Sequence, residues 1–469
     1  MSDKLTMSAS ERIAALLDGS SFVEVGSMVK DRATDFNLNP LDVSGDGVIT
    51  GYGQIDGRLV YVYSQDASLA GGAIGEMHAK KISNIYSMAM KMGAPVIGLI
   101  DCAGFRLKEA TDSLHSFGAL YKKSVMASGL IPQITAVFGN SGGGMTLFTA
   151  LSDFNFVVKG ASYYTNTPDS IKDKNGEKAD TSSAEFVEKN TSLVDKVCQS
   201  DMEAISEIRN LIAFLPSNND DFIDGKTEDD LNRTIPGIEA FVDDSKKIIE
   251  NIADDYIYNE VKAAYGEDIT TGFIRLGGYT VAVVANQNKK MSAKGASKAA
   301  SFVNFADAFN IPVLTITNVS GIENTLENEI AIGQESAKLV SAFANATVPK
   351  VDLITGDAFG SAYVMMNSKS LGSDIVYAWP SAKAGLMDPK KAAEILFSED
   401  IENTSEKVDA IKAGEEKLIN SQNGAAALAG RGYVDDVIEP DATRKRIIAA
   451  FDMLATKRED RPIKKHISF

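Results

Sequence analysis

The sequence predicts an α/β protein made of two similar domains, and three observations carry this prediction. Strand and helix patterns alternate along the 469 residues. The apolar run Pro95–Ile100 has the length and composition of a central strand covered on both faces of a sheet. The chain also repeats itself, because residues 93–105 resemble residues 310–322 at an offset of 217.

Each element of the first half is predicted from its own pattern. The residues on either side of Asp56-Gly57 have the composition of two strands joined by a tight turn. Apolar residues between Ala73 and Met92 recur at helical spacing. In chain order, the first half is predicted to contain a helix at 10–18, two strands within 47–64, a helix at 73–92, a strand at 95–100, a helix near 112–128 and a strand at 131–138.

The second half repeats this order, which indicates an internal duplication. Two glycine turns lie at the same offset of 217, each between an apolar strand pattern (131–138 or 348–354) and a helical pattern. We therefore predict two domains of similar size, residues 1–235 and 236–469. The paired glycines are Gly139 with Gly356 and Gly143 with Gly360.

The stretch between the repeats, roughly 170–235, is the most polar part of the chain. Its charged segment Lys172–Asp180 is predicted to be a solvated surface excursion. A helix is expected near 199–214, and a linker is expected before Ile235-Pro236.

Composition excludes several classes of protein. Lys and Arg number 47 against 64 Asp and Glu, so the net charge is −17. Nucleic-acid binding relies on clustered cations, and so does docking on an anionic membrane. No apolar stretch reaches 18 residues, and residues 1–12 lack the apolar segment of a secretory signal. We expect a cytoplasmic protein without membrane insertion and without nucleic-acid partners.

Cysteine and histidine are too few for several kinds of site. The chain has two cysteines, Cys102 and Cys198, and three histidines. These numbers exclude a disulfide scaffold and a zinc ribbon, and no metal site is predicted. Cys102 follows an apolar run and is expected to be a buried structural thiol. His78 lies within a predicted helix and is expected to be a packed histidine.

The glycine cluster Gly139–Gly144 is the strongest candidate site. It joins an apolar strand to a helix, and only glycine allows a sharp turn together with close approach of a ligand to the backbone. Unpaired N–H groups at the start of the helix can hold an oxyanion. A tight turn with a purely structural role is the alternative. A phosphate loop is rejected because Met145 and Thr146 stand where Lys and Ser or Thr are required.

The second copy, Gly356–Tyr363, has the same setting between a strand and a helix. Two such turns in related domains suggest a reaction with two developing negative oxygens. Backbone donors can carry such chemistry without a side-chain base, since removal of one oxyanion donor typically costs ~10²–10³ in rate. The scarcity of histidine agrees with this hypothesis.

Three further patterns are weaker. Ala89–Met92 reproduces the tetrapeptide around biotinylated lysine in carrier domains, but here it ends a helix, so its lysine is expected to be unmodified. Gly45–Gly51 is interpreted as turn chemistry rather than a dinucleotide fingerprint. Asp101, Arg106 and Glu109 follow a strand, where they could bind a ligand or form a salt-linked structural loop.

The chain resembles, almost end to end, the carboxyltransferase subunit of biotin-dependent acyl-CoA carboxylases and decarboxylases, of the propionyl-CoA carboxylase beta and methylmalonyl-CoA decarboxylase alpha type. The matching segments are together specific to that family, although each alone is weak. They are Arg12–Asp18 with Ser21–Glu24, Gly45–Gly51, Ser64–Asp66, Gly71-Gly72, His78–Lys80, Gly93–Gly98, Ala306–Pro312, Ala346–Lys350 and Tyr377–Pro380.

The resemblance implies a fold and an assembly. Each half would be a crotonase/ClpP-like domain, a twisted superhelix of β-β-α units. The N-terminal domain would bind the acyl-CoA and the C-terminal domain carboxybiotin, with the site between domains of different subunits in a homohexamer. Biotin would arrive on a separate carrier protein. A biotin carboxylase subunit or membrane decarboxylase subunits would be further partners.

The resemblance also implies roles for residues. The N–H groups of Gly143 and Gly144 would hold the enolate oxygen of the thioester. Those of Gly360, Ser361 and Ala362 would hold the ureido oxygen of biotin. Carboxybiotin would release CO₂, the biotin N1 anion would take the α-proton, and the enolate would attack CO₂. The acyl-CoA-binding residues would be Gly71, Gly72, Ala73, Ala103, Gly104 and Arg106, and the biotin-side residues Ser320, Gly321, Tyr363 and Val364.

The chain departs from the family pattern in both halves. Where Asp-Ser-Gly-Gly-Ala-Arg is common, residues 101–106 read Asp-Cys-Ala-Gly-Phe-Arg. Where Gly-Gly-Ala-Tyr is common, residues 360–363 read Gly-Ser-Ala-Tyr, and Val364 replaces an Asp common in propionyl-type relatives. A Leu-Gly-Gly-Ala segment near 185 and the tandem glycines of the loop at 320–328 are absent. These changes bear on the substrate more than on the fold.

Four functions stay open at this point. The first is carboxyl transfer to a short-chain acyl-CoA, such as propionyl-CoA or acetyl-CoA, which forms methylmalonyl-CoA or malonyl-CoA. The second is the same reaction in reverse, in the alpha subunit of a sodium-pumping decarboxylase. The third is a catalytically silent assembly subunit, which the altered second site motivates. The fourth, a biotin-free hydratase or isomerase, would normally need acidic residues beside one oxyanion hole.

Overall fold

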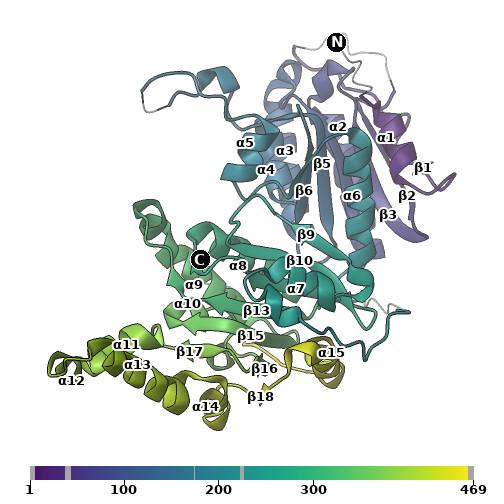
Figure 1. Cartoon of the computed structure of the whole chain (residues 1–469). Coiled ribbons are helices and arrows are strands. Elements are labelled where there is room, and N and C mark those ends of the chain that lie inside the picture. The colour runs from purple at the N-terminus through teal and green to yellow at the C-terminus, as the bar shows by residue number, and fades with distance from the viewer. Residues whose placement is uncertain (1–5, 37–43, 174, 222–226, 463–469) are drawn as a thin grey trace. The chain divides into compact units, whose positions relative to one another are not determined.

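The computed structural model describes residues 6–36, 44–173, 175–221 and 227–462. The chain divides into two compact units, residues 1–222 and 223–469, and each is described by itself (Figure 1). The sequence places the boundary after residue 235. Ile235 packs in the core of the second unit. Arg233 donates hydrogen bonds to the carbonyls of Asn251 and Ala253 in the same unit.

The first unit is built on one sheet with the strand order β1-β2-β3-β4-β5-β6-β8, and β7 pairs with β5 (Figure 1). β2 and β3 form an antiparallel hairpin around Asp56-Gly57, which confirms the predicted turn. The pairs from β3 onward are parallel. The strands are β1 (Val23–Glu24), β2 (Val48–Ile55), β3 (Arg58–Gln65), β4 (Val96–Cys102), β5 (Gln133–Gly142), β6 (Phe154–Val158), β7 (Ser162–Tyr164) and β8 (Lys196–Cys198).

The helices of the first unit begin and end at recognisable capping residues. Ser8 and Glu11 form a capping box on α1. α2 ends at Gly93, whose φ of 62° is left-handed, so the tetrapeptide around Lys91 ends a helix as predicted. The helices are α1 (Ala9–Leu16), α2 (Glu76–Met92), α3 (Ala110–Ala127), α4 (Gly144–Ala150), α5 (Ala184–Asn190) and α6 (Asp201–Phe214), with short 3-10 turns η1 (Ala70–Gly72), η2 (Leu107–Glu109) and η3 (Pro168–Ser170).

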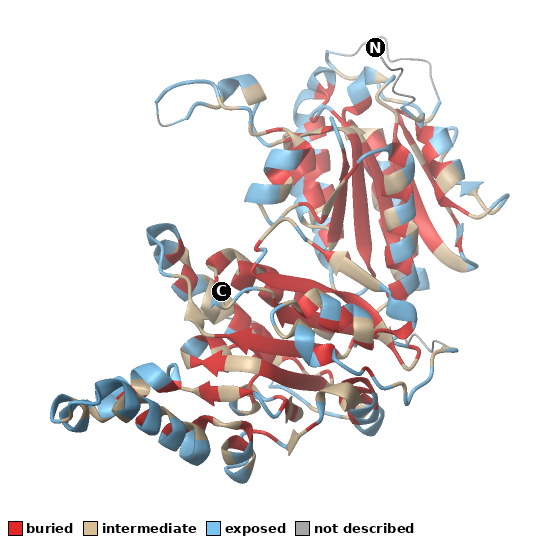
Figure 2. Cartoon of the chain, in the orientation of Figure 1, coloured by how far each residue is buried: buried red, intermediate tan, exposed pale blue. Residues whose placement is uncertain are grey.

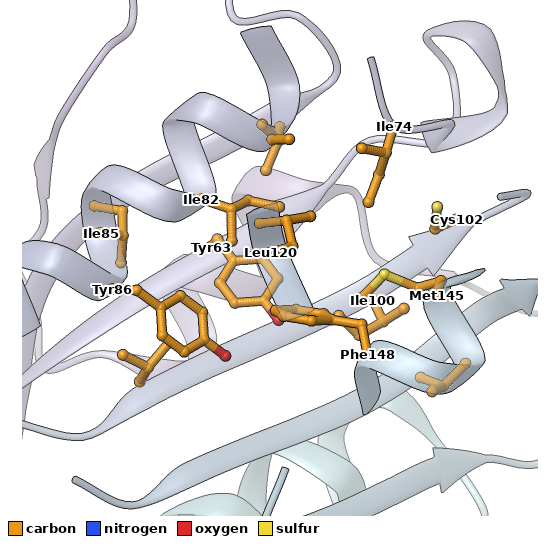
Figure 3. Packing of buried hydrophobic residues seen from close by; sticks show 14 of the residues in the cluster. Tyr63, Ile74, Ile82, Ile85, Tyr86, Ile100, Cys102, Leu120, Met145 and Phe148 are labelled. Carbon is orange, nitrogen blue, oxygen red and sulfur yellow. The ribbon is translucent and has the colours of Figure 1, made fainter. Parts of the chain in front are cut away.

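The core of the first unit lies between α2, α4 and the sheet. Figure 3 shows Tyr63 from β3, Tyr86 from α2 and Phe148 from α4 turned toward one another. Their ring centroids are 5.9–6.5 Å apart, which is the range of favourable aromatic contacts. The apolar face of α2 that periodicity predicts, including Ile82 and Ile85, packs into this cluster. The core therefore holds α4, which begins at the first glycine turn, against the sheet.

The second unit is built on a sheet of the same kind, with the order β18-β16-β15-β13-β11-β10-β9 and β17 beside β15. β9, β10 and β11 are antiparallel neighbours, and the pairs from β11 onward are parallel. β12 and β14 form a separate parallel pair. The strands are β9 (Tyr258–Val261), β10 (Ile269–Leu276), β11 (Tyr279–Asn286), β12 (Lys290–Met291), β13 (Val313–Val319), β14 (Gly321–Ile322), β15 (Lys350–Phe359), β16 (Ile375–Ala378), β17 (Lys383–Gly385) and β18 (Asp436–Val437).

Most helices of the second unit expose one face and bury the other, whereas the long strands of its sheet are mostly buried (Figure 2). Trp379 is fully buried, and its indole N–H donates to the hydroxyl of Thr443 at 3.0 Å. The helices are α7 (Ser245–Ile252), α8 (Ala293–Ala308), α9 (Leu326–Asn345), α10 (Gly360–Val364), α11 (Pro389–Leu396), α12 (Ser398–Glu402), α13 (Lys407–Leu418), α14 (Ala425–Gly430) and α15 (Thr443–Leu454), with short turns η4 (Ile238–Phe241), η5 (Asp254–Tyr256), η6 (Lys369–Leu371), η7 (Ile419–Asn423) and η8 (Pro440–Ala442).

The predicted duplication is visible in the backbone. The two units share the order of a β-hairpin, a helix, a parallel strand, a second helix, a long strand and a short helix. Left-handed backbone positions recur at the same offset of 217, where side chains are disfavoured and glycine is favoured. The pairs are Gly93 (φ 62°) with Asn310 (φ 54°), Gly104 (φ 114°) with Gly321 (φ 147°) and Gly143 (φ 54°) with Gly360 (φ 64°).

Two other expectations concern the surface. In the predicted excursion, residues 172–173 and 175–178 are exposed, and a bridge pairs Lys172 with Lys178. None of the helices in the described parts of the chain combines the length and apolarity that crossing a membrane requires.

Candidate functional site

The first glycine turn lies where β5 gives way to α4. Gly143 has φ 54° and ψ −115°, a conformation that favours glycine. Its N–H donates to the carbonyl of Tyr164 on β7 at 2.8 Å. The prediction that this N–H faces a substrate is therefore wrong in this structure, because the neighbouring strand already uses the donor.

Gly144 keeps a donor at the same turn. It is the first residue of α4, and the first N–H groups of a helix have no acceptor inside it. The Tyr121 hydroxyl donates to the Gly144 carbonyl at 2.8 Å and fixes the orientation of this peptide. A Cβ at Gly144 would lie 2.8 Å from the Tyr121 oxygen and 3.0 Å from the Phe117 ring. A side chain at this position therefore requires Tyr121 and Phe117 to shift.

The segment from η1 to Ile74 and the segment after β4 lie side by side along this turn. The Ala103 N–H donates to the Gly71 carbonyl at 3.0 Å, and the Ile74 N–H donates to the Gly104 carbonyl at 2.9 Å. A Cβ at Gly104 would lie 3.2 Å from the Gly142 carbonyl oxygen. Five predicted acyl-CoA-binding residues are thus brought together beside Gly142–Gly144: Gly71, Gly72, Ala73, Ala103 and Gly104.

Arg106 is a correction to the predicted acyl-CoA site. Its side chain is buried, and each of its five N–H donors has a protein acceptor. The acceptors are the carbonyls of Ala73 and Asp46 and the carboxylates of Asp46 (2.5 Å) and Glu109 (2.8 Å). A guanidinium engaged in this way has no donor left for a phosphate or carboxylate ligand. Arg106 instead holds the Ala73 segment. Arg106 and Glu109 are salt-linked, whereas Asp101, the third residue of the predicted loop, pairs with Arg12.

Asp46 and His78 complete this buried network, and sequence reasoning missed Asp46. The residue lies between two left-handed glycines and itself has φ 48°. A charged residue in such a turn is the signal that could have identified it. The His78 Nδ1–H donates to the Asp46 carbonyl at 2.9 Å, and burial lowers the pKa of His78 to about 3. His78 is therefore a neutral, packed histidine, as predicted.

The second glycine turn lies between β15 and α10. Gly360 takes the left-handed position, whereas Ser361 is not among the residues with positive φ. The replacement of a family glycine by Ser361 therefore causes no backbone strain. As the first residues of α10, Gly360, Ser361 and Ala362 present their N–H groups without intrahelical acceptors.

A pocket of about 410 Å³ opens beside the second turn. Of the predicted residues, Ser361 and Val364 line it, whereas Tyr363 packs against the buried cluster of β15, β16 and β17. Ser320 donates to the Lys289 carbonyl, and Gly321 lies on β14, which contacts α10. The lining is mostly apolar and consists of Ile322, Ile332, Gly333, Ser336, Val340, Ser361, Val364 and Met365.

Each turn is anchored by the same hydrogen bond, one repeat apart. In the first unit, the Asn140 N–H donates to Asp101 Oδ1 at 3.1 Å. In the second unit, the Asp357 N–H donates to Asn318 Oδ1 at 3.0 Å. Gly139 and Gly356 directly precede these N–H groups. A Cβ at either position would collide with the anchoring side chain, Asp101 or Asn318. The duplication therefore extends to the residues that orient the turns.

A buried carboxyl, Asp352, lies on β15 in the second unit and was not singled out by sequence reasoning. Its Oδ1 accepts hydrogen bonds from the hydroxyls of Thr315 (2.7 Å) and Thr317 (2.8 Å). Its Oδ2 has no partner among the described residues. Burial raises the pKa of Asp352 to about 7, against the two hydroxyl bonds, which lower it.

The pKa of Asp352 predicts a pH dependence of stability. Between pH 3.8 and about 7 the folded chain holds a proton that the unfolded chain has released. The stabilisation is therefore complete below this range and is lost as the pH rises through about 7. We expect the stability advantage of Asp352→Asn over the wild type, measured by thermal unfolding, to grow from pH 5.5 to about 7 and to level off above it. The exposed control Asp436→Asn should show a constant difference, and a constant difference for Asp352→Asn would contradict the account.

No group of three or more His, Cys, Asp or Glu side chains suited to a metal ion occurs among the residues that the structure describes. Cys102 and Cys198 are both buried, and burial raises the pKa of each thiol to about 12. The backbone N–H groups at the start of α4 and α10 are a chemical feature that the two turns share.

Comparison with known proteins identifies the family. Residues 4–469 match the model of the carboxyl transferase domain. Methylmalonyl-CoA decarboxylase subunit alpha of Propionigenium modestum is 41% identical, with 98% of this chain and 92% of that protein covered. The propionyl-CoA carboxylase beta chain of Roseobacter denitrificans is 39% identical, with 98% and 93% covered.

A solved structure shows the same fold over nearly the whole chain. Transcarboxylase 12S, a hexamer crystallised with methylmalonyl-coenzyme A and methylmalonic acid, superposes with a TM-score of 0.94 at 35% identity. The match covers 98% of this chain and 92% of that one. It confirms the predicted tandem crotonase-like architecture. With a family model that spans the chain and relatives near 40% identity, the chain belongs to the carboxyl transferase family.

Proposed function

We propose that the protein moves a carboxyl group between carboxybiotin, held on a partner carrier protein, and the α-carbon of a short-chain acyl-CoA. The duplicated glycine turns are the observation that carries this proposal. The reaction develops negative charge on two oxygens, one on the thioester and one on the ureido ring. In each unit, a glycine turn begins a helix whose first N–H groups have no acceptor within that helix. Related proteins are named for propionyl-CoA and methylmalonyl-CoA.

The first turn is assigned to the thioester oxygen. The Gly144 N–H is one donor, because the Gly143 N–H is taken by Tyr164. The Gly104 N–H is the second, since its partner is the Cys102 sulfur at 3.3 Å, a weak acceptor that an oxyanion can displace. Both N–H groups belong to segments held by buried bonds, so the donors are positioned before the substrate arrives.

The second turn and its pocket fit the bicyclic ring of biotin. The pocket volume of about 410 Å³ lies within the range typical of small-ligand sites, and its lining is apolar apart from serines. The proposed donors to the ureido oxygen are the N–H groups of Ser361, which lines the pocket, and of Ala362, which follows it in α10. When bound, carboxybiotin supplies the carboxyl group and a ring nitrogen that accepts the α-proton. The chain itself contributes orientation and N–H donors, and no protein base is assigned.

The direction of the reaction depends on the partners. With a biotin carboxylase subunit the chain would carboxylate an acyl-CoA, and with membrane decarboxylase subunits it would remove the carboxyl group. The site is the same in both cases, because the two directions share one transition state. We propose a biotin carrier protein as the common partner.

We also propose that several copies of the chain associate, as in the hexameric transcarboxylase. The equivalent helices α3 and α9 both expose apolar side chains that a monomer would leave in water. Each also has an outward glycine, Gly118 or Gly333, with open space where a Cβ would stand. The exposed apolar residues are Leu114, Val125 and Met126 on α3 and Leu326, Ile330 and Val340 on α9.

A substitution that introduces a charge on α9 tests whether this helix takes part in the association of the chains. Ile330 is 80% exposed, so Ile330→Glu should leave the fold of the single chain intact. By light scattering, we expect the wild type to have a multiple of the chain mass of 50.1 kDa, and we expect the variant to lose this assembly together with its activity. The control Met28→Glu carries the same charge at another exposed apolar residue and should keep both. An unchanged mass for Ile330→Glu would exclude α9 from the interface.

The function is tested by carboxyl-group loss from acyl-CoA substrates. Purified protein is mixed with free biotin and malonyl-, methylmalonyl- or glutaconyl-CoA. We expect turnover with at least one short-chain substrate that requires biotin and is blocked by avidin. Absence of turnover with every substrate, in a protein that still assembles, would favour the silent assembly subunit. Turnover without biotin would contradict the proposal.

A further inference from the structure

The Phe105 side chain lies beside the first glycine turn and has no part in the buried network. It follows Gly104 directly, and its side chain is 40% exposed. Its ring edge is 3.9 Å from where a Cβ at Gly143 would stand. The aromatic ring therefore lies beside Gly143, the residue directly before Gly144, whose N–H is the proposed donor.

The ring is held in this place by its neighbours. The centroid of Phe105 is 4.6 Å from that of Phe117, which is buried and itself 5.9 Å from Tyr121. Inward movement of Phe105 is blocked because Phe117 and Tyr121 already fill the space against Gly144. The Phe105 backbone is fixed as well, through its bridge to Ile74. The Phe105 ring is therefore held in a fixed position beside the turn.

We propose that Phe105 determines substrate specificity by limiting the acyl group to two or three carbons. This inference rests on the proposed function. If the thioester oxygen is bound by the N–H groups of Gly104 and Gly144, the α-carbon is one bond from the carbonyl carbon and lies next to the ring. A methyl substituent fits beside the ring, whereas an ethyl or larger group collides with it.

The prediction is a change of selectivity in Phe105→Ala. The wild type should use malonyl-CoA and methylmalonyl-CoA and should discriminate against ethylmalonyl-CoA. We expect the variant to raise the ratio of kcat/KM for ethylmalonyl-CoA over methylmalonyl-CoA by at least tenfold, since one methylene in an apolar pocket is worth about 10–200-fold. Phe105→Leu should give an intermediate ratio.

Leu107→Ala is the matched control. Leu107 is two residues further along the same segment, and its side chain is 88% exposed, so it contacts no part of the site. Its selectivity ratio should equal that of the wild type. Unfolding temperature and assembled mass are compared for all variants, and Phe105→Leu keeps an apolar side chain against Phe117 if the alanine variant is unstable.

Measurements of acyl-CoA binding test the role of Phe105 independently of carboxyl transfer. The affinities of propionyl-CoA and butyryl-CoA are measured by calorimetry without biotin. We expect Phe105→Ala to improve the relative affinity of butyryl-CoA, and this result would stand even if no carboxyl transfer were detected. A selectivity ratio and an affinity ratio that both stay within threefold of the wild type in Phe105→Ala would overturn the assignment of Phe105.

Discussion

Replacement of Gly144 by proline should lower kcat for biotin-dependent decarboxylation by about 10²–10³-fold, because it removes one oxyanion donor. Proline is tolerated at the first residue of a helix, so α4 can still form. KM for the acyl-CoA should change much less than kcat, since the charge on the thioester oxygen develops mainly in the transition state. The measurement is steady-state kinetics with methylmalonyl-CoA and free biotin.

Gly144→Ala is the control that isolates the N–H group. A Cβ at this position meets the Tyr121 oxygen at 2.8 Å and the Phe117 ring at 3.0 Å, so the alanine and proline variants share this crowding. Only the proline variant lacks the donor. We expect Gly144→Ala to keep most of the activity that Gly144→Pro loses. Equal losses in the two variants would show that crowding, rather than the missing N–H, is responsible.

Replacement of Arg106 by methionine should destabilise the first unit strongly. The variant leaves the buried carboxylates of Asp46 and Glu109 without their cation. Loss of one partner from a buried ion pair costs about 3–5 kcal/mol. For a unit of this size that corresponds to a fall in unfolding temperature of roughly 6–20 °C. Differential scanning calorimetry measures the fall directly.

The exposed arginine Arg32 provides the comparison for this prediction. It pairs with Glu76 and Asp112, but its side chain is half exposed. Surface pairs contribute about 0–1 kcal/mol, so Arg32→Met should change the unfolding temperature by only a few degrees. If Arg106→Met unfolds at the same temperature as Arg32→Met, the five hydrogen bonds of Arg106 do not stabilise the first unit as described.

The sequence predicts most of the fold because the decisive signals are local or repeated. The hairpin at Asp56-Gly57 needs only a turn between two apolar runs. The end of α2 needs only a glycine and a proline after a periodic segment. The left-handed positions at Gly143 and Gly360 are marked by glycines in the same place in both copies.

The site is less predictable, because its details depend on segments that are far apart in the chain. The Gly143 N–H donates to the Tyr164 carbonyl, and the sequence does not show that the strand of Tyr164 pairs with β5. The Arg106 guanidinium donates to the carboxylates of Asp46 and Glu109, and Asp46 lies 60 residues away in the sequence. A motif shows which residue types are present. Which of their N–H donors are already hydrogen-bonded within the protein becomes clear only from the folded structure.

The central claim is that the carboxyl group passes between the acyl-CoA and biotin on this chain. The most direct test follows the label from methylmalonyl-CoA with a ¹⁴C-carboxyl group, in the presence of free biotin, with the products trapped as methyl esters. We predict labelled carboxybiotin methyl ester together with unlabelled propionyl-CoA, and loss of both in Gly144→Pro. Label released without ever appearing on biotin, or free coenzyme A from thioester hydrolysis, would contradict the account.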